Sequence, residues 1–391
     1  MIRVSLQSLK VGMKLGKAIY TEEGKLLLGR GVIINEFFVK NLSKRGINSV
    51  FIHDDATEDV DPVESISEMV RGSTIAHLRN LFDSLEDINK EMKDQSFQAV
   101  SSAVTSKRFI ETFGKNPAFQ KLTEDASKMV DQLMGGDVTI GLNSIKTFDN
   151  YTFQHSLDVS IVAIMMAKKF GLPEKRLREL GIGCLLHDMG KVLIPVDIVN
   201  KPGKLTEQEF VIMKSHPLIG YELTKGVSSI GLLPPHVALQ HHEKQDGSGY
   251  PRGLTGNNHL KIDMIPRTIH LFGNIVAVAD VYDALGSDRP YRPALPPEKV
   301  FSIIHEMSGT HLNSQAVNLL FKIAPVYPVG TTIRVISQDK YGYIGVVVTL
   351  NEGSLNRPNI RLILDNRKMR IDPININLEE SMDVQVESII L

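Results

Sequence analysis

The sequence predicts a multidomain protein in which a large all-α helical core lies between a small α+β domain and a small β-rich module. Three observations predict this. Short runs that alternate apolar and polar residues fill positions 1–53. Positions 65–325 repeat apolar residues at i, i+3, i+4 and i+7, as in ISEMVRGSTIAHLRNLFDSL. From position 326 onward, strand-like runs such as GYIGVVVTL are separated by polar turns.

The elements follow in order along the chain. Strand-like runs VSLQSL and KLGKAIY, a helical run INEFFVKNLSKRG and a last strand INSVFI make up the predicted N-terminal domain, residues 1–53. The acidic run DDATEDVDPVE, residues 54–64, reads as a solvated linker because it contains proline and no basic residue. A helical connecting segment (65–124), the main helical domain (125–325) and the β module (326–391) complete the chain.

Composition excludes several classes of function. The net charge is −1 and the pI about 6.9, so no overall field attracts a nucleic acid polymer or an anionic membrane. The most apolar run, VSIVAIMMA at 159–167, is too short for membrane insertion. No signal peptide pattern is seen, and the lone Cys184 excludes an internal disulfide and reads as a core residue. We therefore expect a cytoplasmic protein.

Histidines and acidic residues gather at the edges of apolar helices in the central region. Taken singly, each is more often a satisfied polar residue than a ligand. Asp280 interrupts the apolar run NIVAVADVYDA, and a buried carboxylate needs a cation or a strong hydrogen-bond partner. Together the residues suggest a buried metal centre with nitrogen and oxygen ligands, which suits Fe, Mn, Co or Zn: His155, His187, Asp188, His216, His241, His242 and Asp280.

These motifs also carry a family resemblance. His187-Asp188, the run HHEKQDGSGYPRGL at 241–254 and the run VADVYDALGSDRPYR at 278–292 resemble the signature of HD-GYP domain proteins, a branch of the HD phosphohydrolase superfamily. The resemblance covers roughly residues 125–325. Residues 1–53 resemble the small domain that often precedes this type in bacteria.

The resemblance implies a cyclic di-GMP phosphodiesterase that yields pGpG and, in some members, GMP. It assigns all seven residues above as metal ligands, with Asp188 bridging two Fe or Mn ions and a bridging hydroxide as nucleophile. Some members bind a third ion through a glutamate where this chain has Tyr151, so we expect two ions.

The resemblance also implies substrate contacts. Lys191 is expected to place its charge on the scissile phosphate, with a solvated lysine as the rival interpretation. Gly249, Tyr250 and Pro251 are expected to form a loop that contacts a guanine base. The rival interpretation is a turn without a binding role. Arg289 and Arg292 would meet phosphate or base, or form a charged surface turn. Asp283 would hydrogen-bond substrate or orient a ligand histidine.

Two departures leave the substrate open. The segment 253–280 is longer than usual, and Asn274 stands where many members have arginine. A preference for 3′,3′-cyclic GMP-AMP is therefore an alternative. So are a non-catalytic module that binds a cyclic dinucleotide or a partner, and a di-iron oxygenase. The family also suggests diguanylate cyclase domains as partners through the surface around Tyr250, and leaves a homodimer open.

Overall fold

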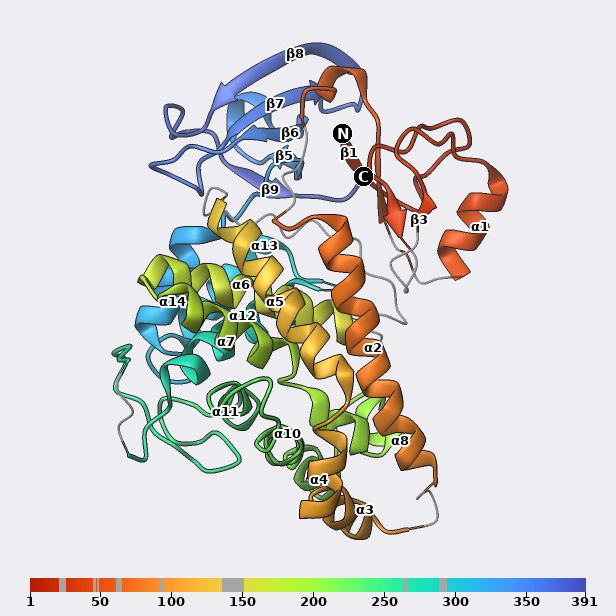
Figure 1. Ribbon diagram of the computed structural model, residues 1–391. Coiled ribbons are helices and arrows are strands. Elements are labelled where there is room, and N and C mark those ends of the chain that lie inside the picture. The colour runs from red at the N-terminus through yellow and green to blue at the C-terminus, as the bar shows by residue number, and fades with distance from the viewer. Residues whose placement is uncertain are drawn as a thin grey trace.

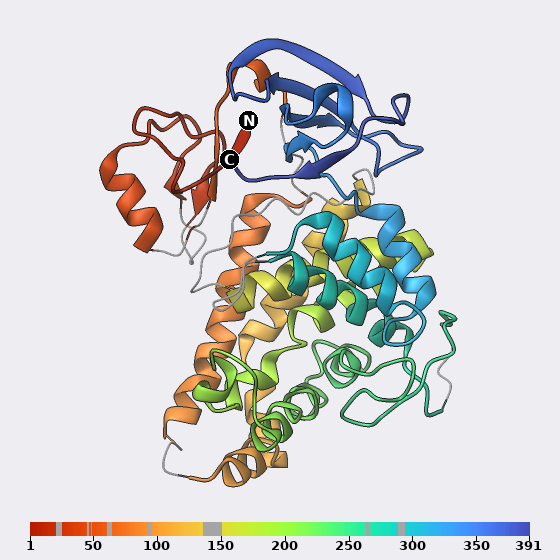
Figure 2. The ribbon, with the colours of Figure 1, turned by 180° about the vertical axis from the view of Figure 1, so that it is seen from behind.

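A computed structural model describes residues 1–20, 26–44, 47, 49–60, 65–91, 95–135, 151–262, 266–287 and 294–391. They form a helical body with two sheet-containing parts at one end (Figure 1). The view from behind shows the same arrangement (Figure 2). The predicted helical core and the sheet in the C-terminal region are thus confirmed. Within these residues, no helix has the length and apolar character needed to cross a membrane.

The helical body begins with a long helix and ends with two short ones beside the C-terminal sheet. Its helices are α2 (Glu68–Glu91), α3 (Phe97–Val104), α4 (Lys107–Phe113), α5 (Pro117–Gly135), α6 (Tyr151–Phe170), α7 (Glu174–Leu185), η3 (Met189–Leu193), α8 (Val196–Val199), α9 (Glu207–Met213), α10 (His216–Thr224), α11 (Pro234–Gln240), α12 (Leu271–Gly286), α13 (Pro297–Met307) and α14 (Ser314–Ile323).

Helix α6 lies at the centre of this body. Its residues 154–167 are buried on every side, which is why the run shows almost no polar face. It packs against α7 and α12, and Val162 and Met166 are fully buried there. Each such side chain stabilises the fold by about 1.5–3 kcal/mol. This packing fixes the position of His155, near the N-terminal end of the helix.

Helix α12 brings two carboxylates to the same region. Its first nine residues, 271–279, are buried, and Asp280 and Asp283 follow in the next turn. The helix begins after His270, whose ring Nδ1 accepts a hydrogen bond from the Phe272 N–H at 3.1 Å. An N-cap of this kind satisfies one of the free donors at a helix start.

The N-terminal part, residues 1–60 as far as described, contains two small antiparallel pairs and one helix. Strand β1 (Ile2–Ser5) pairs with β4 (Ser49–Ile52), and β2 (Ile19–Tyr20) pairs with β3 (Leu26–Leu28). Helix α1 (Glu36–Lys44) packs beside them through Leu42. A turn of 3-10 helix, η1 (Asp55–Thr57), follows β4.

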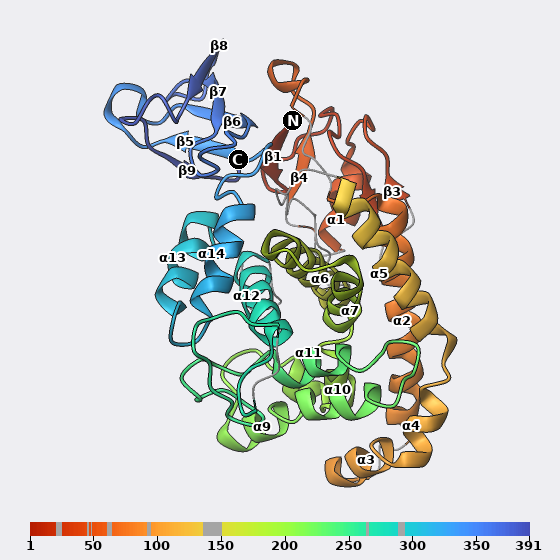
Figure 3. The ribbon, with the colours of Figure 1, turned by 60° about the vertical axis from the view of Figure 1, so that its left-hand side comes forward.

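The C-terminal part is one antiparallel sheet with strand order β8-β7-β6-β5-β9. Its strands are β5 (Thr332–Val335), β6 (Ile344–Thr349), β7 (Asn359–Leu364), β8 (Arg370–Asn377) and β9 (Val386–Ser388), with a 3-10 turn η4 (Gln338–Lys340). The sheet lies beside the N-terminal part (Figure 3). Ile363 completes the hydrophobic core of that part, so the two share packed side chains.

The acidic segment expected to be a solvated linker is partly folded. Asp59 forms a two-pronged ion pair with Arg361 of the sheet, at 2.6 and 2.9 Å. Asp54, which is buried, pairs with Arg370. Two acidic side chains of residues 54–60, those of Asp54 and Asp59, thus bind arginines about three hundred positions away, which no local pattern could indicate. Residues 61–64 lie outside the described part.

Candidate metal centre

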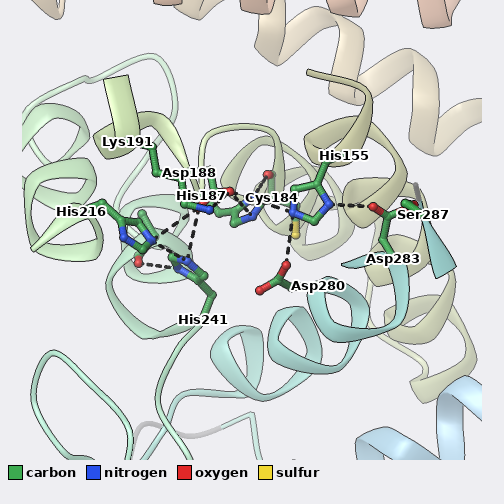
Figure 4. Close-up of polar contacts among 11 residues, drawn as sticks. His155, Cys184, His187, Asp188, Lys191, His216, His241, Asp280, Asp283 and Ser287 are labelled. Atoms are coloured by element: carbon green, nitrogen blue, oxygen red, sulfur yellow. Dashed lines mark hydrogen bonds and ion pairs between the residues drawn. The ribbon is translucent and has the colours of Figure 1, made fainter. Parts of the chain in front are cut away.

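All seven residues predicted as ligands come together in one place. Figure 4 labels all of them except His242. They arrive from five segments: α6, the turn after α7, the start of α10, the end of α11, and α12. Except for His242 and Asp280, which are partly exposed, all are buried. The side chains are His155, His187, Asp188, His216, His241, His242 and Asp280.

Asp188 lies between two groups of histidines. Its Oδ1 is 3.5 Å from Nε2 of His216 and 3.6 Å from Nε2 of His241. Its Oδ2 is 3.5 Å from Nε2 of His187 and 3.9 Å from Nε2 of His155. Neighbouring ligands of an octahedral ion with bonds of about 2.1 Å lie roughly 3 Å apart. The carboxylate therefore has one oxygen in each of two ligand groups.

Backbone carbonyls fix the tautomer of three of these histidines. Nδ1 of His187, His216 and His241 each lies 2.7 Å from the carbonyl oxygen three residues earlier, in Cys184, Met213 and Ala238. A carbonyl oxygen only accepts, so each Nδ1 carries the hydrogen. Nε2 of a neutral ring is then a lone pair that faces the centre, as in metal-binding histidines.

Burial keeps two of these rings neutral. It lowers the pKa of His187 to about 4 and that of His216 to about 3. Nε2 of His216 lies 3.2 Å from Nε2 of His241, whose Nδ1 likewise donates to a backbone carbonyl. Nε2 of His187 and Oδ1 of Asp188 are buried without a hydrogen-bond partner among the described residues. Such lone pairs suit divalent cations, and nitrogen and oxygen donors without thiolate suit Fe, Mn, Co or Zn.

His155 is held by two carboxylates of α12. Its Nδ1 lies 2.6 Å from Asp283 and its Nε2 3.1 Å from Asp280. Burial by itself lowers the pKa of His155, but the two carboxylates outweigh it and raise the pKa to about 9. Asp283 is buried and accepts from His155, and its Oδ1 lies 3.3 Å from the Ser287 hydroxyl. This geometry favours an orienting role for Asp283 over contact with substrate.

Lys191 contacts the shared carboxylate. Its Nζ lies 2.6 Å from Oδ2 of Asp188, and the side chain is 30% exposed, so the charge borders the centre and solvent together. Burial raises the pKa of Asp188, but Lys191 and His187 outweigh it and hold that pKa well below its usual range. Asp188 is therefore an ionised carboxylate.

The glycine-rich loop folds back onto the centre. The Tyr250 ring lies 4.8 Å from the His242 ring at an interplanar angle of 36°, and the Tyr250 N–H donates to the His242 carbonyl. A Cβ at Gly249 would lie 2.4 Å from the Lys244 nitrogen, so only glycine fits. Pro251 follows in the same turn. The loop thus places Tyr250 beside one candidate ligand.

Glu243 was missed from the sequence. It is buried, and its two carboxylate oxygens accept from the backbone N–H groups of Arg252 and Leu254, each at 2.8 Å. It therefore holds the far side of the Tyr250 loop. The sequence did contain one signal for this role: Glu243 is an acidic residue directly after two predicted ligands and just before a glycine-rich turn, whose backbone N–H groups need acceptors.

Other predicted positions have different outcomes. Arg289 and Arg292 lie outside the described residues, as does the side chain of Tyr151. Asn274 is buried, accepts from Gln245 at 2.7 Å and donates to the carbonyls of Ile269 and His270. It thus makes structural contacts within the long loop before α12. Cys184 is buried, as expected.

Comparisons with known proteins agree with this geometry. Residues 143–315 match the HD domain family. The chain is 35% identical over 250 residues to the cyclic di-GMP phosphodiesterase PA4108 of Pseudomonas aeruginosa, covering 63% of this chain and 57% of that protein. It is 42% identical over 168 residues to the cyclic di-GMP phosphodiesterase response regulator RpfG of Xanthomonas campestris pv. campestris, covering 42% and 41%.

A third relative bears a different substrate in its name. The chain is 34% identical over 224 residues to the 3'3'-cGAMP-specific phosphodiesterase 1 of Vibrio cholerae, covering 56% of this chain and 48% of that protein. The chain thus spans about half the length of these relatives. Residues 143–315 carry the HD doublet, the gathered histidines and the Tyr250 loop. This part of the chain is therefore similar to the HD domain family, and the HD doublet and the Tyr250 loop within it are the motifs that resemble HD-GYP proteins.

Proposed function

We propose that the protein is a metal-dependent phosphodiesterase that hydrolyses cyclic di-GMP, with pGpG or GMP as the end product. The observation that carries this proposal is the position of Asp188, whose two carboxylate oxygens face two separate groups of histidines. Relatives named for cyclic di-GMP hydrolysis support the choice of substrate.

The first group offers His155, His187 and Asp188, with Asp280 beside His155; the second offers Asp188, His216, His241 and His242. Two divalent ions bound there would supply an acidified water and would neutralise charge on the phosphate. We assign iron or manganese to the site, with two ions per chain.

The remaining residues position the substrate. Lys191 borders both Asp188 and solvent, so its charge can reach a phosphate oxygen at the centre. Tyr250 offers a ring face next to His242, where a guanine can stack. Gly249 allows the backbone to approach closely, and Pro251 completes the loop. Arg289 and Arg292 keep their predicted role at phosphate or base.

A cyclic GMP-AMP phosphodiesterase is the second candidate, because one relative is named for that substrate. The two substrates differ in one base, so discrimination depends on hydrogen bonds to a base edge. A non-catalytic module is less consistent with the site, since every predicted ligand position holds a side chain that can bind a metal. A cytoplasmic location, diguanylate cyclase partners and a homodimer remain predictions.

The test is anaerobic reconstitution with Fe(II) or Mn(II), followed by separate incubation with cyclic di-GMP and cyclic GMP-AMP and product analysis. We expect pGpG from cyclic di-GMP at the higher kcat/KM. His187→Ala should lose turnover by at least about 10³-fold together with bound metal, because it removes a ligand. His259→Ala, on the exposed loop, is the matched control and should keep both. Undiminished turnover in His187→Ala refutes the proposal.

A further inference from the structure

Helix α9 has no fully buried side chain, although Ile212 and Met213 pack partly buried against the helical core. A helix of seven residues is too short to be stable by itself. Thr206 and Glu209 form a reciprocal capping box at its start. Lys201 binds both carboxylate oxygens of Glu209, at 2.8 and 2.6 Å. These polar contacts, together with the packing of Ile212 and Met213, fix the orientation of α9.

The side chain that α9 presents to the candidate centre is aromatic. The Phe210 ring lies 6.2 Å from the Tyr250 ring at an angle of 80°, and Tyr250 in turn lies 4.8 Å from His242. The Lys214 ammonium lies 4.9 Å from the centre of the Phe210 ring. A series of rings thus leads from a candidate ligand to the surface and ends beside a positive charge.

Phe210 remains 45% exposed in this position. The Phe210 ring is thus an apolar surface that is open to solvent beside the candidate centre. Exposed apolar surface beside a polar centre is typical of a ligand contact. Two rings at nearly a right angle form a corner into which a flat ring can fit, stacking on one and meeting the edge of the other.

We propose that Phe210 is a substrate-binding residue that, together with Tyr250, holds one purine base of the cyclic dinucleotide, with Lys214 beside it. This inference rests on the proposed function for the identity of the substrate. Stacking accepts any purine, so Phe210 contributes affinity, and the choice between guanine and adenine is made elsewhere. Tyr250 and His242 lie between Phe210 and the candidate centre, so we expect Phe210 to affect substrate binding and not the rate of the chemical step.

Kinetics give the first test. Phe210→Ala should raise KM for cyclic di-GMP about tenfold and leave kcat within about twofold, because each base stacked on an aromatic ring contributes strongly to affinity. Phe210→Tyr keeps the ring and should restore KM. Val211→Ala on the same helix should behave as wild type. Phe210→Ala with wild-type KM overturns the proposal, and would leave this surface to a protein partner.

Fluorescence gives a second test that needs no turnover. The chain contains no tryptophan, so Phe210→Trp introduces a single reporter. GMP should quench it by stacking, whereas ribose 5-phosphate, which lacks the base, should not. Val211→Trp is the matched control and should respond to neither. Equal quenching of the two reporters by GMP overturns the base contact.

The two proposals fail in different ways. Wild-type protein that leaves both cyclic dinucleotides intact after metal loading refutes the proposed function, and the GMP titration of Phe210→Trp still decides the base contact. Wild-type turnover combined with an unchanged KM in Phe210→Ala refutes only the role of Phe210.

Discussion

The Nε2 atoms of His216 and His241 lie 3.2 Å apart, and Nδ1 of each ring donates to a backbone carbonyl, so a neutral ring at either position presents an Nε2 lone pair to the other. Two lone pairs at this distance repel each other unless a cation lies beside both. Asp188 Oδ1 lies 3.5 Å from the first and 3.6 Å from the second, which completes a cation site with three donors. Metal binding should therefore stabilise the fold.

Adding Mn(II) at about a hundred times its Kd should raise the Tm by about 5 °C or more, since such binding contributes about 2.7 kcal/mol. Asp188→Asn keeps the shape but removes the negative charge, and should lose most of this shift. Differential scanning fluorimetry with and without Mn(II) measures both. Equal shifts in the two proteins would mean that the ions bind elsewhere.

Lys191→Met should lower kcat by about 100-fold, because a positive charge next to Asp188 is removed from the centre that receives the phosphate. Lys191→Arg keeps the charge and should recover part of the activity. Metal content, measured by mass spectrometry, should stay near that of wild type in both variants. A loss of metal that parallels the loss of kcat would instead assign Lys191 to metal retention.

Glu243→Gln should raise KM about tenfold with unchanged metal content. An amide can accept from only one side, so its NH₂ group would face one of the N–H groups of Arg252 and Leu254. The unmet bond costs about 1–3 kcal/mol and loosens the loop that carries Tyr250. Glu352→Gln, in an exposed turn, is the control. Wild-type KM in Glu243→Gln would show that the loop is held by its other contacts.

His270 makes the stability of the fold depend on pH. Burial, with His236 and Arg176 nearby, lowers its pKa from 6.5 to about 4, and its Nδ1 must stay unprotonated to cap α12. As the pH falls, His270 is therefore protonated at a higher pH in the unfolded chain than in the folded chain. The contribution of His270 is fully present above pH 6.5 and is lost as the pH falls toward 4, on the order of 1 kcal/mol per unit.

His270→Asn keeps an N-cap acceptor without the titrating group. Urea unfolding at pH 8 and pH 5 should show a smaller loss of unfolding free energy in His270→Asn than in wild type. The same loss in both proteins would place the pH dependence in other groups.

Sequence reasoning could locate the centre because its ligands follow apolar helical runs. His187 and Asp188 end the run of α7, and His241 and His242 end that of α11, so burial and polarity meet at each helix end. The family signature then supplied the grouping. For Asp283 the sequence left two roles open, contact with substrate or with a ligand histidine; the packing of α6 on α12 brings it to His155, 128 positions away.

The fold was likewise predictable in its main parts, the helical body and the C-terminal sheet, but not in the contacts between distant segments. Period-3.6 patterns identified the helical body, and alternating runs identified the C-terminal sheet. The acidic segment was expected to be solvated throughout because no basic residue lies near it in the sequence. Its arginine partners, Arg361 and Arg370, are about three hundred positions away. Glu243 escaped notice because its partners are backbone groups, which have no sequence signature.

The side chain of Ile363, in β7, lies within the hydrophobic core of the N-terminal part, and Leu364 packs against the same cluster. Melting either sheet-containing part would therefore expose apolar surface of the other. The two ends of the sequence should consequently denature as a single cooperative block, and calorimetry should resolve at most two heat-absorption peaks, one for this block and one for the helices.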